Sequence, residues 1–315
     1  MFDKVKFWID RAIAGEQYPA IANHLDAVKK ITDVSTGEVV TSGSLSGLKV
    51  SIRSSGISVI GSLPKFLYDG SNFYPLDRHT TAEAVEKIAD TLHIAMSSAL
   101  VISIEFGTIF PMMHPISRYL MKLGDIPRMV RKQTESTLYY TGNSNSNSQP
   151  KVYTLYDKIA DAKAKGMDYP NDMQDKNILR FEIRFNGRLK QQLRVPEVHA
   201  STLSTRPFYQ MMVKRYQDIY FSISKNRKIV TNMSEIRTPT DAIKMLFAVL
   251  MSQSDPAIIS EFMAELKSSG TFTDRKYYSR VKNMIKELSA KANSAETDEL
   301  IKELDDAIKN VGAYM

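Results

Sequence analysis

Three segments of the chain combine an apolar face with charged or reactive side chains. The segment VISIEFG carries Glu105, LRFEIRF carries Glu182, and KVYTLYDK carries Tyr156 and Lys158, each alternating with apolar residues. Successive side chains of a β-strand point to opposite faces of the sheet, so this alternation predicts strands with one apolar and one polar face. If the three strands belong to one sheet, two carboxylates, a tyrosine, a lysine and arginines meet on one surface.

Such a set of groups suits the chemistry of phosphodiesters. Carboxylates without competing soft ligands favour a hard cation such as Mg²⁺ or Mn²⁺, and the cation would polarise a phosphodiester and stabilise charge in the transition state. A tyrosine phenol can attack phosphorus and hold a DNA end covalently, while Lys158 or Arg184 stabilises the phenolate or the phosphate oxygens. The alternation of glutamate and arginine in LRFEIRF also has a plainer explanation, a cross-strand ion pair on a solvated face.

The composition is that of a globular protein, with 43% hydrophobic and 24% charged residues in a chain of 315. The absence of cysteine excludes disulfides, thiolate catalysis and cysteine-ligated metal sites, and it fits a reducing cytosol. The first residues, MFDKVKFWIDR, alternate and predict a strand rather than a signal peptide. No apolar run is long enough to cross a membrane, so we expect a cytoplasmic protein without membrane contact.

Strand patterns dominate the first part of the chain and helical periodicity the last. Strands are predicted at 48–53, 57–62, 100–106, 135–140, 151–156 and 177–185, and helices at 80–95, 115–123, 157–165, 207–222, 238–251, 256–268, 274–292 and 297–311. We therefore expect an α+β fold in which an antiparallel sheet is covered by helices on one face and followed by a helical C-terminal domain. The division is expected near residue 225, giving a catalytic domain at 1–225 and a second domain at 226–315.

An ordered set of short motifs carries a resemblance to a known family. The run LKVSIRSSGISVIGSLPKFLYDGSNFYPL is followed by AEAVEKIADTLHI, VISIEFGTIF, TLYY, KVYTLYDKIADA and ILRFEIRFNGRL. Over roughly Leu45 to Leu193, this order and spacing resembles the replication initiators of filamentous phages, and it is similar to the wider group of phage and plasmid rolling-circle proteins called the gene II/X family.

The resemblance implies a site-specific single-strand endonuclease and strand transferase that initiates rolling-circle DNA replication in a bacterial host cell. By motif, Tyr156 is the nucleophile that forms a 5′-phosphotyrosyl link and leaves a 3′-hydroxyl for a polymerase. Glu105 and Glu182 are the implied ligands of Mg²⁺ or Mn²⁺, and Lys158 is an implied helper, beside which Arg184 is a catalytic candidate from its residue type alone. The expected partner is DNA, as the origin duplex and its single strand; a host helicase and polymerase and a second copy of the chain in a homo-oligomer are further candidates.

Basic residues are concentrated in the middle of the chain, within a net charge of +7. This distribution indicates a polyanion partner, although a solvated basic face is an equal explanation. The helix at 207–222 and its flanks are the favoured phosphate-binding element, and the start of the helix near residue 274 could enter a groove. The C-terminal helices could equally serve packing or oligomerisation. The candidate DNA contacts are Arg180, Arg188, Arg128, Arg131, Lys132, Lys214, Arg215, Arg275 and Lys276.

Several alternatives stay open from the sequence. The His-hydrophobic-His motif of many rolling-circle initiators is absent, which favours a cation held by carboxylates. Tyr139 and Tyr140 are candidates for a second active tyrosine, although strand tyrosines more often serve packing. The different functional classes are a non-catalytic protein that binds an origin or single-stranded DNA, and a relaxase or transposase of a mobile element.

Overall fold

The computed structural model describes residues 1–18, 20–142, 150–225, 236–253, 256–292 and 299–312. The chain divides into two compact units. The first comprises Met1–Met121, Asp125–Ile223 and Leu304–Met315, and the second comprises Lys122–Gly124 and Ser224–Glu303. The sequence prediction places a single division near residue 225; the long segment of the second unit begins at Ser224, but this unit also takes in Lys122–Gly124, and the residues from Leu304 onward belong to the first unit.

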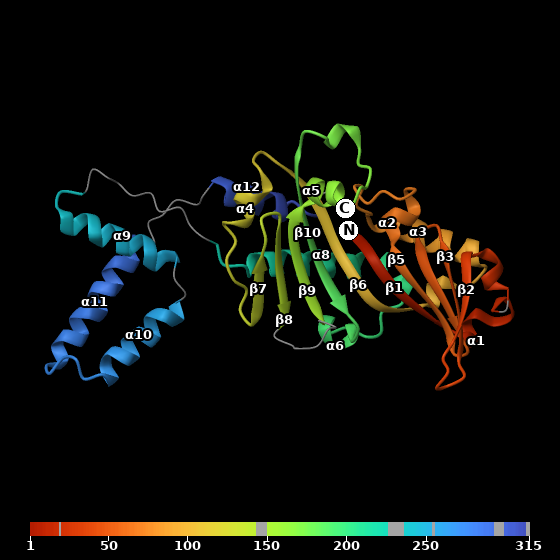
Figure 1. Ribbon diagram of the computed structural model, residues 1–315, viewed down its shortest axis with the longest axis horizontal. Coiled ribbons are helices and arrows are strands. Elements are labelled where there is room, and N and C mark those ends of the chain that lie inside the picture. Colours follow the sequence, from red (N-terminus) through yellow and green to blue (C-terminus); the bar gives the residue numbers. More distant parts are fainter. Residues whose placement is uncertain (19, 143–149, 226–235, 254–255, 293–298, 313–315) are drawn as a thin grey trace. The chain divides into compact units, whose positions relative to one another are not determined.

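The first unit is built on one antiparallel sheet, as the sequence predicted (Figure 1). Its strands, in the spatial order β2-β3-β4-β5-β1-β6-β10-β9-β8-β7, place segments from the beginning, middle and end of the unit side by side. The strands are β1 (Phe2–Asp10), β2 (Asp26–Thr32), β3 (Val39–Leu45), β4 (Leu48–Arg53), β5 (Gly56–Ser62), β6 (Leu100–Met112), β7 (Met129–Gln133), β8 (Thr137–Gly142), β9 (Lys151–Asp157) and β10 (Asn177–Asn186).

One face of the sheet carries the main core. Leu179, Phe181, Ile183 and Phe185 of β10 are buried on this face. The ring of Phe181 lies 4.5 Å from that of Tyr216 in α8 (Arg206–Phe221). The Tyr216 hydroxyl donates to the Phe181 carbonyl at 3.1 Å, which satisfies a buried polar group. Helix α8 runs across the strands behind the sheet in Figure 1. At its end, the hydroxyl of Tyr220 donates to Asp305 at 2.7 Å and anchors α12 (Glu299–Lys309).

The opposite face is bordered by two short helices, α2 (Leu63–Leu67) and α5 (Lys158–Ala164). A small apolar cluster beneath α5, formed by Phe73, Ile159, Ala162 and Ile178, fixes that helix against the sheet. The remaining helices of the first unit are α1 (Arg11–Ala14), α3 (Arg78–Leu92), α4 (Ile116–Leu120), α6 (Leu189–Leu193) and α7 (Ala200–Leu203).

The second unit is helical, as predicted, and contains α9 (Pro239–Gln253), α10 (Pro256–Ser268) and α11 (Arg275–Ala292). Helices α9 and α11 pack against each other. Aromatic and aliphatic side chains of the three helices, with Phe272, line an apolar cavity of about 570 Å³ within this unit.

Two differences from the sequence prediction bear on the site. Strand β6 continues to Met112 because every residue of β10 pairs with it, from Asn177 opposite Met112 to Asn186 opposite Ser103. Lys158 does not belong to the strand that carries Tyr156, because the Asp157 side chain accepts from the backbone N–H groups of Ile159 and Ala160 and so begins α5.

Candidate active site

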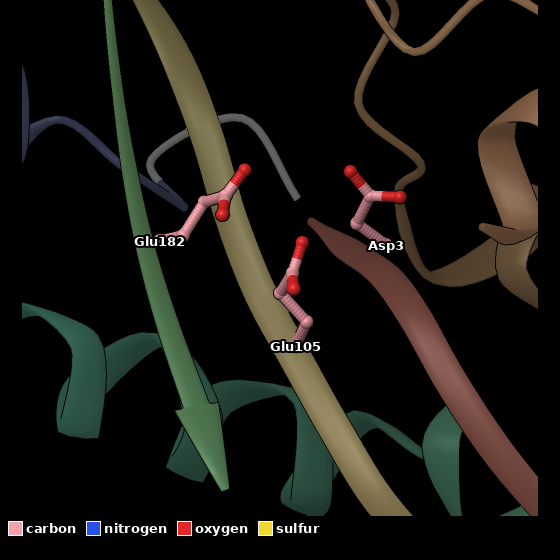
Figure 2. A group of neighbouring side chains, drawn as sticks. All are labelled: Asp3, Glu105 and Glu182. Atoms are coloured by element: carbon pink, nitrogen blue, oxygen red, sulfur yellow. The ribbon is translucent and has the colours of Figure 1, made fainter. Parts of the chain in front are cut away.

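A β-bulge in the first strand creates one wall of the site. Phe2 pairs with Phe106 and Val5 with Ile104, so that both Asp3 and Lys4 stand opposite Glu105. The extra residue breaks the alternation that would otherwise place Asp3 on the same face as Val5. The Asp3 carboxylate therefore lies beside Glu105, on the face of the sheet opposite α8 (Figure 2).

Glu182 comes from the neighbouring strand and leans over a glycine. Gly107 is its register partner, and a Cβ atom there would lie only 2.5 Å from the Phe181 carbonyl oxygen and 3.1 Å from Glu182 Cγ. A glycine is therefore required for the two strands and the Glu182 side chain to fit together. The Glu182 carboxylate accepts a hydrogen bond from the Tyr156 hydroxyl at 2.8 Å.

Asp3, Glu105 and Glu182 converge on one point (Figure 2). One oxygen from each carboxylate lies within 4.8 Å of the other two, and all three residues are buried. Hard cations bind oxygen at about 2.0 to 2.6 Å, so oxygens on opposite sides of one ion are about 4 to 5 Å apart. The spacing and the purely carboxylate donor set thus fit a single divalent cation, and the residues present could hold one.

Two arginines form ion pairs with the three carboxylates and offset part of their charge. Arg180 is 2% exposed and forms ion pairs with both Asp3 and Glu182, and its Nη1 donates to the Asn72 carbonyl at 3.1 Å. Arg184 donates through Nε to Glu105 at 2.7 Å and keeps a side chain that is 40% exposed. The prediction that Arg180 contacts DNA is therefore wrong, because its guanidinium is enclosed by the carboxylates, whereas Arg184 can reach a ligand.

Lys158 reaches the same cavity from the first turn of α5. Its ammonium donates to Asn72 Oδ1 at 2.8 Å and lies 4.8 Å from the centroid of the Phe73 ring. Asn72 also donates from Nδ2 to Asp3 at 3.3 Å, so this one side chain positions a carboxylate and the lysine together. The sequence prediction placed Lys158 with Tyr156, and the structure brings both to one cavity of about 580 Å³ that includes the three carboxylates.

Burial and the neighbouring charges shift the pKa values of the groups in the site. Burial, with the nearby charges of Glu182 and Asp3, raises the pKa of Glu105 to about 7. Burial would also raise the pKa of Asp3, but Arg180 and the hydrogen bonds from Ser62 and Asn72 lower it overall. Burial raises the pKa of the Tyr156 phenol far above its ordinary value, and Glu182 adds to the rise. Burial and the charge of Arg180 lower the pKa of Lys158 to about 8.

The other candidate tyrosines lie on different faces of the sheet. Register pairs connect Tyr139 to Thr154 and Thr154 to Glu182, so Tyr139 lies on the face of the carboxylates, 40% exposed. Tyr140 pairs with Tyr153, and both are buried on the opposite face, which excludes them from this surface.

The remaining predicted DNA contacts are distributed over several surfaces. Lys132 pairs with Tyr139 and so lies on the face of the carboxylates, whereas Arg131 pairs with Tyr140 on the opposite face. Helix α8 places Lys214 and Arg215 on the side of the sheet opposite the carboxylates. Arg128 and Arg188 are exposed in the first unit. Arg275 and Lys276 are exposed at the start of α11 in the second unit, where Lys276 forms an ion pair with Asp274 at 2.7 Å.

Sequence reasoning missed Asp3 and Asn72. The alternation in MFDKVKFWIDR groups Asp3 with Val5 and Phe7, and only the bulge turns it toward the site. The single available signal was an acidic residue at an otherwise apolar phase of a strand. Asn72 lies in a loop, where periodicity gives no indication of direction.

Comparison with known proteins assigns no family. No protein-family model matches the chain, and no curated protein matches it. Within the described residues, no helix combines the length and the apolar character needed to cross a membrane.

Proposed function

We propose that this chain is a metal-dependent tyrosine nickase and strand transferase for DNA, of the kind that initiates rolling-circle replication. The observation that carries the proposal is the Tyr156 hydroxyl, which donates to Glu182 at 2.8 Å inside the cavity that holds the carboxylate triad. A nucleophile, its proton acceptor and a candidate cation site thus occupy one cavity, as phosphoryl transfer through a covalent intermediate requires. The motif resemblance over Leu45 to Leu193 supports the same reaction.

The residues of the cavity account for each proton and bond of the cleavage step. The Tyr156 oxygen attacks phosphorus while its proton passes to Glu182, its hydrogen-bond acceptor. The bond between phosphorus and the 3′-oxygen breaks, and that oxygen takes the electron pair and a proton from Lys158. The lowered pKa of Lys158, about 8, makes its ammonium a stronger acid than an ordinary lysine. The products are a 5′-phosphotyrosyl link and a free 3′-hydroxyl, and the reverse sequence rejoins a strand.

The carboxylate triad supplies the other requirement of this chemistry. Asp3, Glu105 and Glu182 would hold Mg²⁺ or Mn²⁺, because oxygen ligands alone favour hard cations. Such a cation, when bound, would polarise the phosphodiester and stabilise the charge that develops on its oxygens. Arg184, whose side chain is 40% exposed, is placed to contact the same phosphate.

A nicking assay tests this proposal directly. Supercoiled DNA of the genetic element that encodes the chain is incubated with Mn²⁺, and open circles and protein-linked DNA are measured under denaturing conditions. We expect both products with the wild type and neither with Tyr156→Phe. Tyr139→Phe is the matched control, because Tyr139 lies on the same face without contacting the triad, and it should nick normally. Nicking by Tyr156→Phe at the wild-type rate would refute the nucleophile, and tight binding without nicking by the wild type would support the non-catalytic alternative.

A further inference from the structure

Three lysines that have no role in the cleavage step line the cavity of the carboxylate triad. Lys4 lies on β1, Lys49 on β4 and Lys65 on α2, and all three line the cavity that contains the triad. We refer to them as the lysine rim. None was singled out by sequence reasoning, because they are far apart along the chain and only the sheet order brings them together.

The charge of the lysine rim is not neutralised by the protein. Among the described residues, no carboxylate lies within ion-pair distance of the rim ammonium groups, whereas the neighbouring Lys165 pairs with Asp161 at 2.7 Å. The Lys65 ammonium lies 3.4 Å from the sulfur of Met167, a contact that leaves its charge intact. Lys4 and Lys49 are exposed, so their side chains are available to a ligand.

The spacing of the rim identifies an extended ligand. Lys4 pairs with Ser62 and Lys49 with Ile60, so strand β5 separates the two lysines. Adjacent strands are about 4.8 Å apart, which places Lys4 and Lys49 roughly 10 Å from each other across the sheet. Two long lysine side chains can converge on one anion, but contact with both lysines and the buried triad together favours an extended ligand. A chain of phosphates can make these contacts, with one phosphate over the carboxylates and its neighbours over the lysines.

We infer that the lysine rim binds the backbone phosphates of a single DNA strand next to the phosphodiester that is cut. The inference rests on the proposed function and names where its substrate lies. A flexible single strand fits better than a duplex, because the reacting phosphate must descend to residues that are no more than 8% exposed. The contacts are to phosphates, so the rim binds without regard to base sequence.

The test is the salt dependence of binding to labelled oligothymidine of about 20 nucleotides, longer than the sites typical of single-strand binding modules. Binding of the full chain is measured with Mn²⁺ between about 50 and 300 mM salt. Each phosphate contact to a single strand contributes about 0.7 to the slope of log K against log salt. We expect Lys4→Gln/Lys49→Gln to lower that slope by about 1.4, and Lys65→Gln alone to lower it by about 0.7.

The matched control is Lys29→Gln/Lys176→Gln, which removes the same charge from exposed lysines that do not line the cavity. Its slope should equal that of the wild type. Equal slopes for the rim variants and the control would overturn the inference. It would also be overturned if the rim substitutions lowered the slope as much for a duplex of the same length as for the single strand. The binding assay includes no chemical step, so it can be compared with the nicking assay described above. Binding through the rim by a chain that does not nick would refute the proposed function alone. Nicking through Tyr156 with an unchanged slope would refute the lysine rim alone.

Discussion

Replacing Glu105 by glutamine should stabilise the metal-free protein at alkaline pH and destroy its response to cations. Glu105 is 5% exposed and lies beside two other carboxylates, and these surroundings raise its pKa from 4.5 to about 7. A tenfold change in proton affinity corresponds to about 1.4 kcal/mol, so holding this carboxylate charged costs the fold about 3 kcal/mol. The amide of glutamine carries no charge and avoids that cost.

The direction of the pH dependence follows from proton binding. Between pH 4.5 and 7 the unfolded chain has already released the Glu105 proton while the folded chain retains it, so the free energy of unfolding falls as the pH rises. The lowered pKa of Asp3 acts in the opposite sense, adding stability that is lost only in acid below the ordinary pKa of that carboxyl. A comparison between pH 5 and pH 8 therefore isolates Glu105 from Asp3.

The measurement is urea denaturation of the wild type and Glu105→Gln at both pH values, with EDTA. We expect the stability of the variant relative to the wild type to increase by about 2 to 3 kcal/mol between pH 5 and pH 8. The substitution leaves Arg184 without its closest partner, but the guanidinium is 40% exposed and stays 3.9 Å from Glu182, which limits the cost. Glu197→Gln removes an exposed carboxylate and serves as the control, with no change expected between the two pH values.

Adding Mn²⁺ completes the experiment. A free ion at ten times its Kd stabilises the folded state by about 1.4 kcal/mol, and this gain should appear for the wild type at pH 8 and be lost in Glu105→Gln. A relative stability of Glu105→Gln that is the same at pH 5 and pH 8 would refute the electrostatic reasoning. Equal stabilisation of both proteins by Mn²⁺ would refute the assignment of Glu105 as a ligand.

Three further substitutions test how the site and the fold are held together. Gly107→Ala should reduce the free energy of unfolding by about 1 to 3 kcal/mol and weaken the Mn²⁺ response, because the added methyl group collides with the Phe181 carbonyl and displaces Glu182. Asn72→Ala should cost a similar amount in urea denaturation, since the Lys158 ammonium loses its acceptor; a neutral effect would contradict the positioning role. Gln217→Ala should cost about 1 to 2 kcal/mol and make the last helix more sensitive to limited proteolysis, because its amide donates to three carbonyls at the end of α12.

The sequence predicted much of the fold because the strands of the site alternate cleanly. The phase of LRFEIRF places Glu182 and both arginines on one face, and the pairing of β10 with β6 and β9 confirms it. The face of Glu105 and that of Tyr156 were likewise predictable from VISIEFG and KVYTLYDK. These predictions succeed because a strand that is apolar on one side has only one way to face a core.

The rest of the site depends on interactions that periodicity does not encode. Asp3 turns toward Glu105 through a bulge, and its partner Arg180 was expected to contact DNA because it belongs to the basic middle of the chain. The ion pair between Arg180 and Asp3 joins residues 177 positions apart, a relation that only the strand order defines. The role of Asn72 could not be predicted from periodicity either, because it follows from the conformation of a loop.

The strand order also determines when during synthesis this site can exist. Strand β1 is made first. Its neighbour β6 follows only after about a third of the chain has been translated, and the next strand, β10, only after more than half. Until Glu182 has left the ribosome, Asp3 and Glu105 lack both their third carboxylate and Arg180. A nascent or prematurely terminated chain that ends before Glu182 therefore carries no assembled carboxylate centre, and the three carboxylates can meet only after more than half of the protein has been made.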